Sequence, residues 1–330
     1  MRVTTLDAHV GGAAVRLATS GLPRIDGASM AERRLSFDRV ADDVSLLLTR
    51  EPRGHAGLVG VVLTEADRPD ADAGMLFFTG AGPRALSGHA AMAAAALALN
   101  HQLLTTQAPD VLRLDSESGP FSIGIAARDV RQRVRAVRFE GPPAAVLRAN
   151  TRVTTTRRTV RMDIAWSGSE VVAIVEGEAA GVPLSSSHTL ELRRAALELL
   201  AALDELVLAP PGHVDAVPVT ACAFVGPATD LGADVRSVLV RSDGHVSRSP
   251  SASGTAAVSV VLVAMGLLAP GAVYRHESLS GTSWTAEAMP SPLDPDTLTT
   301  VAVTADVYAT GVHEFLVDVG DPLTRGVLWA

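Results

Sequence analysis

The chain has 330 residues, of which 47% are hydrophobic and 19% are charged, and its formal net charge is −8. This composition is typical of a globular protein long enough for two hydrophobic cores, and it excludes disordered, collagen-like and disulfide-rich chains. An acidic balance without basic runs argues against a nucleic-acid partner. The single cysteine, Cys222, cannot form an internal disulfide.

The sequence contains no lysine, so arginine supplies all of its permanent positive side-chain charge. Pyridoxal phosphate enzymes and lysine-dependent aldolases need an amine that condenses with a carbonyl, and a P-loop needs a lysine on the phosphates. None of these classes fits this chain. Residues 1–7 carry no apolar run of the kind found in secretory signals, and we therefore expect a cytoplasmic protein.

The first half predicts short strands around one apolar helix. Runs of β-branched and apolar residues at 60–63, 74–78 and 134–139 are bounded by turn residues and predict strands. The segment 86–100 begins with Ser87-Gly88-His89 and continues through alanine and leucine, which predicts a helix buried on all sides. The two prolines in Gly141–Pro143 predict a linker between this half of the chain and the next.

The second half repeats this plan. An amphipathic helix is predicted at 190–203, with Leu192, Ala195, Ala196 and Leu199 on one face. A second apolar helix is predicted at 250–265. Predicted strands lie at 159–164, 171–175, 217–225, 235–240 and 301–307.

The uncharged run 249–274 is long enough to cross a bilayer. Prolines and glycines interrupt it, small residues fill its first half, and no basic residue flanks its start, so we expect no membrane span. A helix buried inside a globular domain explains the same apolarity.

Ser87 and Ser251 begin the two apolar helices and lie 164 positions apart, about half of the chain. This spacing predicts an α+β fold of two similar domains, each with a mixed or antiparallel sheet wrapped around a central hydrophobic helix. In such a fold the two helix N-termini can face each other across a cleft between the domains. Because each N-terminus offers unpaired N–H groups and partial positive charge, the pair is suited to hold a carboxylate.

Several motifs along the whole chain resemble those of the proline racemase family, which includes hydroxyproline epimerases and trans-3-hydroxyproline dehydratases. The blocks that carry the resemblance are Asp7-Ala8-His9 with Gly11-Gly12, Ser20 to Pro23, Glu51 to His55, Ser87-Gly88-His89, Asp163-Ile164-Ala165, Arg248-Ser249-Pro250, His276-Glu277-Ser278 with Gly281-Thr282, Thr310-Gly311 and Asp321-Pro322.

The resemblance implies a fold like that of diaminopimelate epimerase, in which the last strands return to the first half and the subunits often form homodimers. The domains are then 1–142, completed by about 308–330, and 143–307. It implies a small-molecule carboxylate substrate and no cofactor. Family members move the α-proton with two side chains on opposite faces, usually cysteines, and here those positions are Ser87 and Ser251.

Two further departures from the family bear on the substrate. Ser247 stands where relatives usually carry an aspartate that pairs with the ring ammonium of the substrate. Residues 79–83, Thr-Gly-Ala-Gly-Pro, replace a stretch that usually carries histidine and aromatic residues, which suggests a roomier pocket. The expected substrate is therefore a modified proline-like acid or a biosynthetic intermediate rather than free proline.

The predicted catalytic residues are Ser87 and Ser251. The predicted substrate-binding residues are Gly88, His89, Ser247, Ala252, Ser253 and Gly254. A serine hydroxyl does not ionise readily and needs a neighbouring base, for which His89 is one candidate.

Other readings of these residues remain open. Either catalytic serine can instead be an N-cap, and Ser253 rivals Ser251 if the register slides by two. His9 and His55 are expected to hydrogen-bond loops, and Cys222 to be a buried strand thiol. The histidines show no metal-ligand spacing, so no metal site is expected.

Two functional hypotheses follow. The first is a cofactor-independent isomerase or lyase that acts at the carbon next to a carboxylate, with Ser87 and Ser251 flanking that carbon. The second is a binding protein, or a template that orients a larger substrate for cyclisation, that uses the same cleft without proton abstraction.

Overall fold

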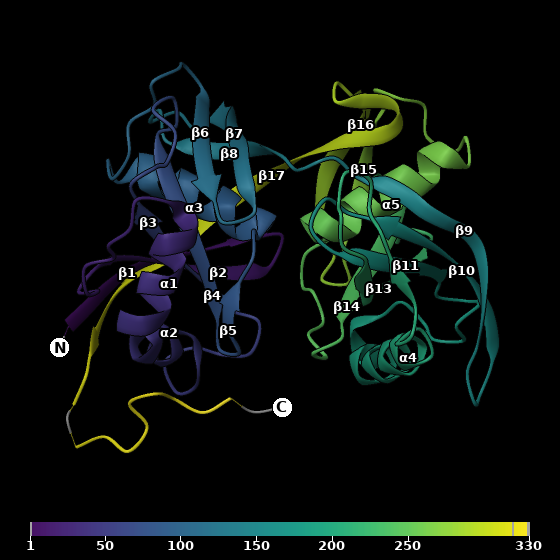
Figure 1. Ribbon diagram of the computed structural model, residues 1–330, viewed down its shortest axis with the longest axis horizontal. Helices are drawn as coiled ribbons and strands as arrows, with labels where there is room; N and C mark the ends of the chain where they lie inside the picture. The colour runs from purple at the N-terminus through teal and green to yellow at the C-terminus, as the bar shows by residue number, and fades with distance from the viewer. Residues whose placement is uncertain (1, 319, 329–330) are drawn as a thin grey trace. The chain divides into compact units, whose positions relative to one another are not determined.

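The computed structural model describes residues 2–318 and 320–328 and has a mixed α+β fold, as predicted (Figure 1). The chain divides into two compact units. Unit 1 contains residues 1–139 and 306–330, and unit 2 contains residues 140–305.

Up to β8, the described part of unit 1 contains eight strands and three helices. Its elements are β1 (Arg2–Val10), β2 (Ala13–Ser20), α1 (Met30–Val40), α2 (Asp42–Thr49), β3 (Val59–Thr64), β4 (Ala73–Thr79), β5 (Gly82–Arg84), α3 (Gly88–Asn100), β6 (Val111–Ser116), β7 (Gly119–Arg128) and β8 (Val134–Glu140).

Unit 2 follows with two helices and a short 3-10 helix among its strands. Its elements are β9 (Ala145–Thr154), β10 (Thr159–Trp166), β11 (Val171–Glu176), η1 (Ser186–His188), α4 (Thr189–Ala201), β12 (Val207–Leu208), β13 (Val217–Gly226), β14 (Val235–Arg241), α5 (Ala252–Ala264), β15 (Val273–Glu277), β16 (Ser283–Ser291) and β17 (Asp294–Leu316).

The two units repeat one order of strand pairing. In unit 1, β2 pairs parallel with β3, β3 antiparallel with β4, β4 parallel with β6, and β6 antiparallel with β7. In unit 2, β11, β13, β14, β15 and β16 follow the same sequence of parallel and antiparallel pairs. Because parallel neighbours need a crossover, each unit places helices after the first and third strands of this series. The apolar helices α3 and α5 are the second crossover of their respective units.

Helix α3 is buried along nearly its whole length. It packs against β1, β2, β3 and β7, and its residues from Ala90 to Ala98 are all buried. Alanine suits this position because it favours the helical state and lets strands approach the helix backbone closely.

Helix α5 packs against β9, β10, β11, β14 and β16, and it is held by hydrogen bonds as well as by apolar contacts. The Thr255 hydroxyl oxygen accepts a hydrogen bond from Trp284 Nε1 at 3.0 Å and lies 3.0 Å from His276 Nδ1. Ser259 donates to the Thr255 carbonyl at 2.7 Å and lies 2.8 Å from the Tyr274 hydroxyl. These contacts connect α5 to β15 and β16.

Strand β17 takes part in both units. Its residues 299–304 pair antiparallel with β16, and its residues 307–316 pair antiparallel with β1. The sequence predicted only a strand at 301–307, because the surrounding residues alternate too weakly between polar and apolar types to predict its length.

Most other predicted elements are confirmed within a few residues. The amphipathic helix predicted at 190–203 is α4, and Leu192, Ala195, Ala196 and Leu199 are buried as expected. The helix predicted at 250–265 is α5, and the one predicted at 86–100 is α3. Within the described residues, no helix is both long and apolar enough to cross a membrane.

Candidate active site

Ser87 is the residue that precedes α3, and its side chain is buried. Its backbone is extended, with φ −120° and ψ 104°, and its carbonyl accepts the first helical hydrogen bond, from Ala91 N, at 2.8 Å. The hydroxyl makes no cap hydrogen bond to the helix and instead lies 3.4 Å from His89 Nδ1. The reading of Ser87 as a side-chain N-cap is therefore wrong.

Ser251 precedes α5 in the equivalent position and is also buried. Its hydroxyl oxygen accepts a hydrogen bond from Gly254 N at 3.4 Å, so this serine does cap its helix. Its backbone has φ +66°, a left-handed conformation that costs a non-glycine residue about 1–3 kcal/mol. Strain of this kind is concentrated at functional sites.

The structure also shows which residues of α3 and α5 correspond to each other. Ser87 and Ser251 both stand one residue before helices of 13 residues, whereas Ser253 lies inside the first turn of α5. Ser251 is thus the counterpart of Ser87, and Ser253 is the counterpart of His89.

Ser253 joins the start of α5 to a partly buried ion pair. Its hydroxyl donates to Glu170 Oε1 at 2.6 Å and lies 3.2 Å from the hydroxyl oxygen of Ser251. Arg241 binds the same carboxylate in bidentate fashion, through Nη2 at 2.6 Å and Nε at 3.1 Å. Arg241 Nη2 also donates to Ser253 Oγ at 3.2 Å. Bidentate, charge-assisted contacts of this kind are among the strongest and most directional in proteins.

Two tight turns place the ion pair beside the helix. Glu170 closes the turn between β10 and β11, where Ser167 N donates to the Glu170 carbonyl at 3.0 Å and Glu170 N donates to Ser167 Oγ at 3.1 Å. Gly168 adopts φ +87° in this turn, and a Cβ there would lie 2.4 Å from the Pro142 carbonyl oxygen. Arg241 ends β14 at a second turn, where its carbonyl accepts from Gly244 N at 2.8 Å.

The other predicted substrate-binding residues occupy the first turns of the helices or the loop before α5. Gly88 and His89 begin α3, while Ala252, Ser253 and Gly254 begin α5. The first N–H groups of a helix have no carbonyl partner within the helix, so these turns are suited to bind an anion. The Ser247 hydroxyl donates to the Ser249 carbonyl at 2.9 Å, which shapes the loop before Ser251.

Sequence reasoning did not find Glu170 or Arg241. The two residues lie 71 positions apart, and each looks like an ordinary turn charge in the sequence. Only the pairing of β11 and β14 with β13 brings them to the start of α5. The motif Ser-Gly-Ser-Glu at 167–170 predicts a turn but carries no signal of the ion pair.

His9, His55 and Cys222 have contacts or burial that account for them structurally. Gly12 N donates to His9 Nδ1 at 3.4 Å, and His55 Nδ1 lies 2.9 Å from the Ala56 carbonyl, so both contact loops as predicted. Burial raises the pKa of the Cys222 thiol to about 12, which makes it unreactive. Residues 79–83 form the β4–β5 hairpin, in which Thr79 pairs with Gly82.

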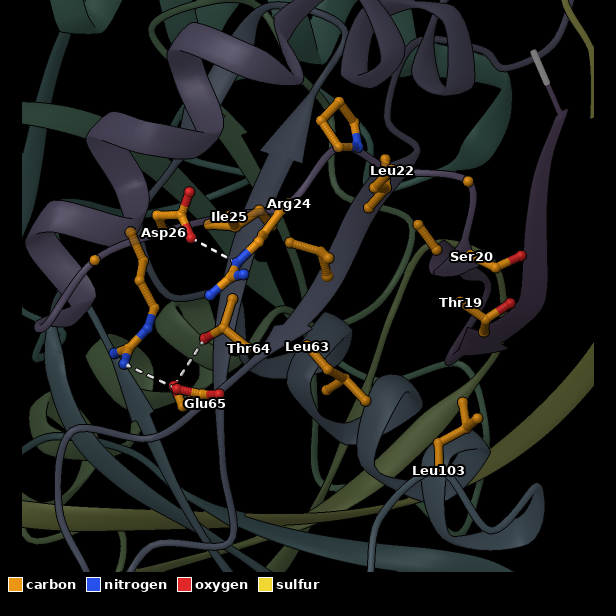
Figure 2. A pocket seen from close by; sticks show the side chains of 16 residues that line it. Thr19, Ser20, Leu22, Arg24, Ile25, Asp26, Leu63, Thr64, Glu65 and Leu103 are labelled. Atoms are coloured by element: carbon orange, nitrogen blue, oxygen red, sulfur yellow. Dashed lines mark hydrogen bonds and ion pairs between the residues drawn. The ribbon is translucent and has the colours of Figure 1, made fainter.

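Two cavities lie away from these serines. One of about 560 Å³ in unit 1 is lined by residues 18–27 and by the end of β3 (Figure 2). Figure 2 shows Arg24 paired with Asp26. The two side chains are 2.7 Å apart, and the apolar Leu63 and Leu103 are among the other lining residues. The other, of about 850 Å³ in unit 2, is lined mainly by residues 181–184 and 225–227. Neither is lined by Ser87 or Ser251, and the charges drawn in Figure 2 already neutralise one another.

No group of three or more histidine, cysteine, aspartate or glutamate side chains gathers as metal ligands within residues 2–318 and 320–328.

Comparison with known proteins assigns the chain to one family. A family model described as proline racemase matches residues 5–328. The chain is 28% identical to the proline racemase of Clostridioides difficile over 329 residues, which cover 99% of this chain and 98% of that protein. It is 29% identical to the trans-3-hydroxy-L-proline dehydratase of Burkholderia cenocepacia over 330 residues, covering 99% and 98% of the two chains.

A solved structure has the same fold. The hydroxyproline epimerase of Agrobacterium vitis, crystallised with bound trans-4-hydroxy-L-proline, superimposes with a TM-score of 0.83 at 23% identity, covering 99% of this chain and 96% of that one. The chain belongs to the proline racemase family.

Proposed function

We propose that this protein is a cofactor-independent isomerase or lyase that acts at the carbon next to the carboxylate of a proline-like acid. Ser87 and Ser251 occupy equivalent positions at the starts of α3 and α5, and this equivalence carries the proposal. The two serines would contact opposite faces of the reacting carbon. Relatives named for racemisation and for dehydration both fit this description of the chemistry.

The substrate carboxylate would be held by backbone N–H groups of the first helical turns. A helix N-terminus supplies both free N–H donors and a partial positive charge, and neither depends on the residue that replaces cysteine. Gly88 and His89 would supply donors in unit 1, and Ala252 and Ser253 would supply them in unit 2. This part of the site would also stabilise negative charge that develops on the carboxylate when the α-proton leaves.

The substrate nitrogen is proposed to be neutral or acylated. Ser247 carries no charge, and its hydroxyl is engaged by the Ser249 carbonyl. A protonated ring nitrogen would lose its usual carboxylate partner at this position, and leaving an ammonium group desolvated without a counter-charge is costly. Free proline is therefore expected to bind more weakly than an N-acyl derivative.

The diaminopimelate epimerase-like arrangement, with an active-site cleft between a domain at 1–142, completed by about 308–330, and a domain at 143–307, is part of the same proposal. So is a homodimer, which sedimentation equilibrium of the purified protein tests directly. The mechanism requires only that both hydroxyls reach one carbon.

One observation favours a second candidate, a binding protein or cyclisation template that does not move protons. Both reacting positions carry hydroxyls, and a hydroxyl is a much poorer proton acceptor at neutral pH than the thiolate that a helix N-terminus promotes. In this reading the cleft would still bind a carboxylate.

Proton exchange separates the two candidates. The protein is incubated in D2O with both isomers of proline, trans-4-hydroxyproline and N-acetylproline, and loss of the α-proton signal is followed by NMR. An isomerase or lyase exchanges or eliminates at least one of these acids, most readily the acylated one. Binding of an acid, measured by calorimetry, without any exchange or elimination would contradict the first candidate and support the second.

The double variant Ser87→Cys with Ser251→Cys sharpens the result. It restores thiols at both positions and should raise the exchange rate on any acid that the pocket accepts. If this variant racemises free proline efficiently, the argument from Ser247 is wrong.

A further inference from the structure

The contact between Ser251 and Ser253 has a defined direction. A hydroxyl group carries one proton, and Ser253 donates its proton to Glu170 Oε1 at 2.6 Å. The 3.2 Å contact between the two serine hydroxyls must then use the proton of Ser251. Ser253 Oγ therefore accepts from Ser251 while it donates to Glu170.

The direction of this hydrogen bond determines whether Ser251 Oγ can donate a proton to a substrate or accept one from it. The Ser251 proton points toward Ser253, and one of the two acceptor lone pairs of its oxygen receives the Gly254 N–H at 3.4 Å. The second lone pair remains for an incoming proton. A serine oriented in this way is arranged to accept a proton, because its own proton already has a path away from the site.

We infer that Glu170, acting through Ser253, is the positioning residue that makes Ser251 the proton acceptor of the reaction. The inference rests on the proposed function, since it assigns a role within that same site. Arg241 fixes the carboxylate through its two contacts and stabilises its negative charge, so that Glu170 presents one oxygen to Ser253. A reacting group, a partner within hydrogen-bond reach and a third group that orients the partner form a recurring catalytic arrangement.

The proton step balances within this chain of groups. The substrate Cα–H bond breaks and its proton forms a bond to Ser251 Oγ, while the Ser251 proton moves to Ser253 and the Ser253 proton moves to Glu170. The electron pair stays on Cα and is delocalised into the substrate carboxylate. In an isomerisation Ser87 protonates the opposite face and regains a proton from water, and Glu170 returns its proton to water. In an elimination the electron pair instead expels the β-substituent.

The equivalent position in unit 1 has different chemistry, which gives the reaction a preferred direction. Ser87 lies 3.4 Å from His89 Nδ1, and His89 is the counterpart of Ser253. A carboxylate can only accept from a hydroxyl relay, whereas an imidazole ring can donate or accept according to its protonation state. Ser251 is thereby the acceptor, and Ser87 is the donor.

Deuterium washout with matched variants tests this inference. The α-deuterated isomers of proline, trans-4-hydroxyproline and N-acetylproline are incubated with the wild type, with Glu170→Gln and with Ser253→Ala. Ser253→Thr keeps the relay hydroxyl, and Glu176→Gln removes a carboxylate from the far end of β11, the strand that follows Glu170. Rates are measured against substrate concentration and in H2O–D2O mixtures, and the thermal unfolding of every variant is recorded.

We expect Ser253→Ala and Glu170→Gln to lower kcat about 100-fold, the lower range for loss of general acid–base assistance, and to leave KM nearly unchanged. Ser253→Thr should recover most of the rate, and Glu176→Gln should match the wild type. The wild-type rate should fall along a curve as the D2O fraction rises, because several protons move together, and Ser253→Ala should give a straight line.

The outcomes separate the inference from the proposed function. If the wild type washes out deuterium and both relay variants keep its kcat and its curved response, the inference is wrong and the proposed function stands. A loss confined to KM or to unfolding temperature, without rescue by Ser253→Thr, also overturns it because the network is then only structural. If the wild type neither washes out deuterium nor eliminates from any of the acids, the proposed function fails and the inference fails with it.

Discussion

The starts of α3 and α5 present the same residue to different neighbours. Ser87 contacts a histidine, His89, whereas Ser251 caps its helix and contacts Ser253, which is bound to an ion pair. Further along the two helices, α5 is again the more polar. At the positions equivalent to the buried Thr255 and Ser259 of α5, α3 has Ala91 and Ala95.

This difference shows how one repeated plan can acquire two chemical roles. Both units place an apolar crossover helix against a mixed sheet, so the position of the serine follows from the topology. The polarity around the serine is set separately, by residues on the neighbouring strands and turns.

The largest expected effect comes from removing each serine alone. With the isomer whose α-proton faces Ser251, Ser251→Ala should lower proton exchange by about 100-fold or more, since the acceptor is lost. Ser87→Ala should keep exchange of that isomer and lose inversion. NMR in D2O measures the first quantity and polarimetry the second.

The half-buried Ser185, which precedes the 3-10 helix η1, offers a control outside the proposed site, and Ser185→Ala should change neither rate. If Ser87→Ala and Ser251→Ala lose proton exchange equally with both isomers, Ser87 and Ser251 are chemically equivalent. That result would contradict the assignment of different roles to the two serines.

A smaller effect is expected from Thr255→Val, which keeps the shape of the side chain and removes its hydroxyl. The Trp284 indole N–H and the His276 ring nitrogen would both lose a buried partner. Each unsatisfied buried group costs about 1–3 kcal/mol, so the free energy of unfolding should fall by about 3 kcal/mol. Urea denaturation measures it.

The half-buried Thr151 on β9 is the control for that substitution, and Thr151→Val should change the free energy of unfolding by less than about 0.5 kcal/mol. A similarly small change for Thr255→Val would mean that apolar packing alone holds α5. The polar contacts of Thr255 would then contribute nothing measurable to stability.

The smallest effect is a pH dependence of stability. Burial lowers the pKa of His276 to about 3, whereas an unfolded histidine titrates near 6.5. Below pH 6.5 the unfolded chain therefore binds a proton that the folded chain does not. Stability is complete above this pH and falls by about 1.4 kcal/mol per pH unit, or about 2 kcal/mol at pH 5.

Urea denaturation at several pH values between 7 and 5 tests this sign. Most carboxylates titrate near pH 4, below this window. His276→Asn, which cannot titrate, should flatten the pH dependence, while replacement of the exposed His55 by asparagine should leave it unchanged. A stability that rises as the pH falls from 6.5 to 5 would contradict the assignment of a neutral buried ring.

The sequence predicted those parts of the fold that depend on local pattern. Ser87 and Ser251 stood out because each precedes a long apolar run, and an apolar run without a polar face has to be buried wherever the chain places it. The amphipathic spacing of Leu192, Ala195 and Leu199 predicted α4 for a similar reason. Helix α1 was not predicted because its buried residues include the charged Arg33 and Arg34.

The parts of the site that the sequence did not predict depend on distant pairings. Glu170 and Arg241 meet because β11 and β14 both pair with β13, and no local pattern encodes that contact. The direction of the Ser251–Ser253 hydrogen bond depends in turn on this ion pair. A sequence can thus show which side chains are available for chemistry while leaving open how their protons are oriented.

The division of β17 between the units has a consequence for biosynthesis. Residues 307–316 complete unit 1 by pairing with β1, yet they are translated after all of unit 2. Until they emerge from the ribosome, β1 presents an unpaired edge, and exposed edges of this kind invite aggregation. A fragment that stops at residue 139 should consequently be poorly soluble, and adding a peptide of residues 306–318 should rescue its solubility.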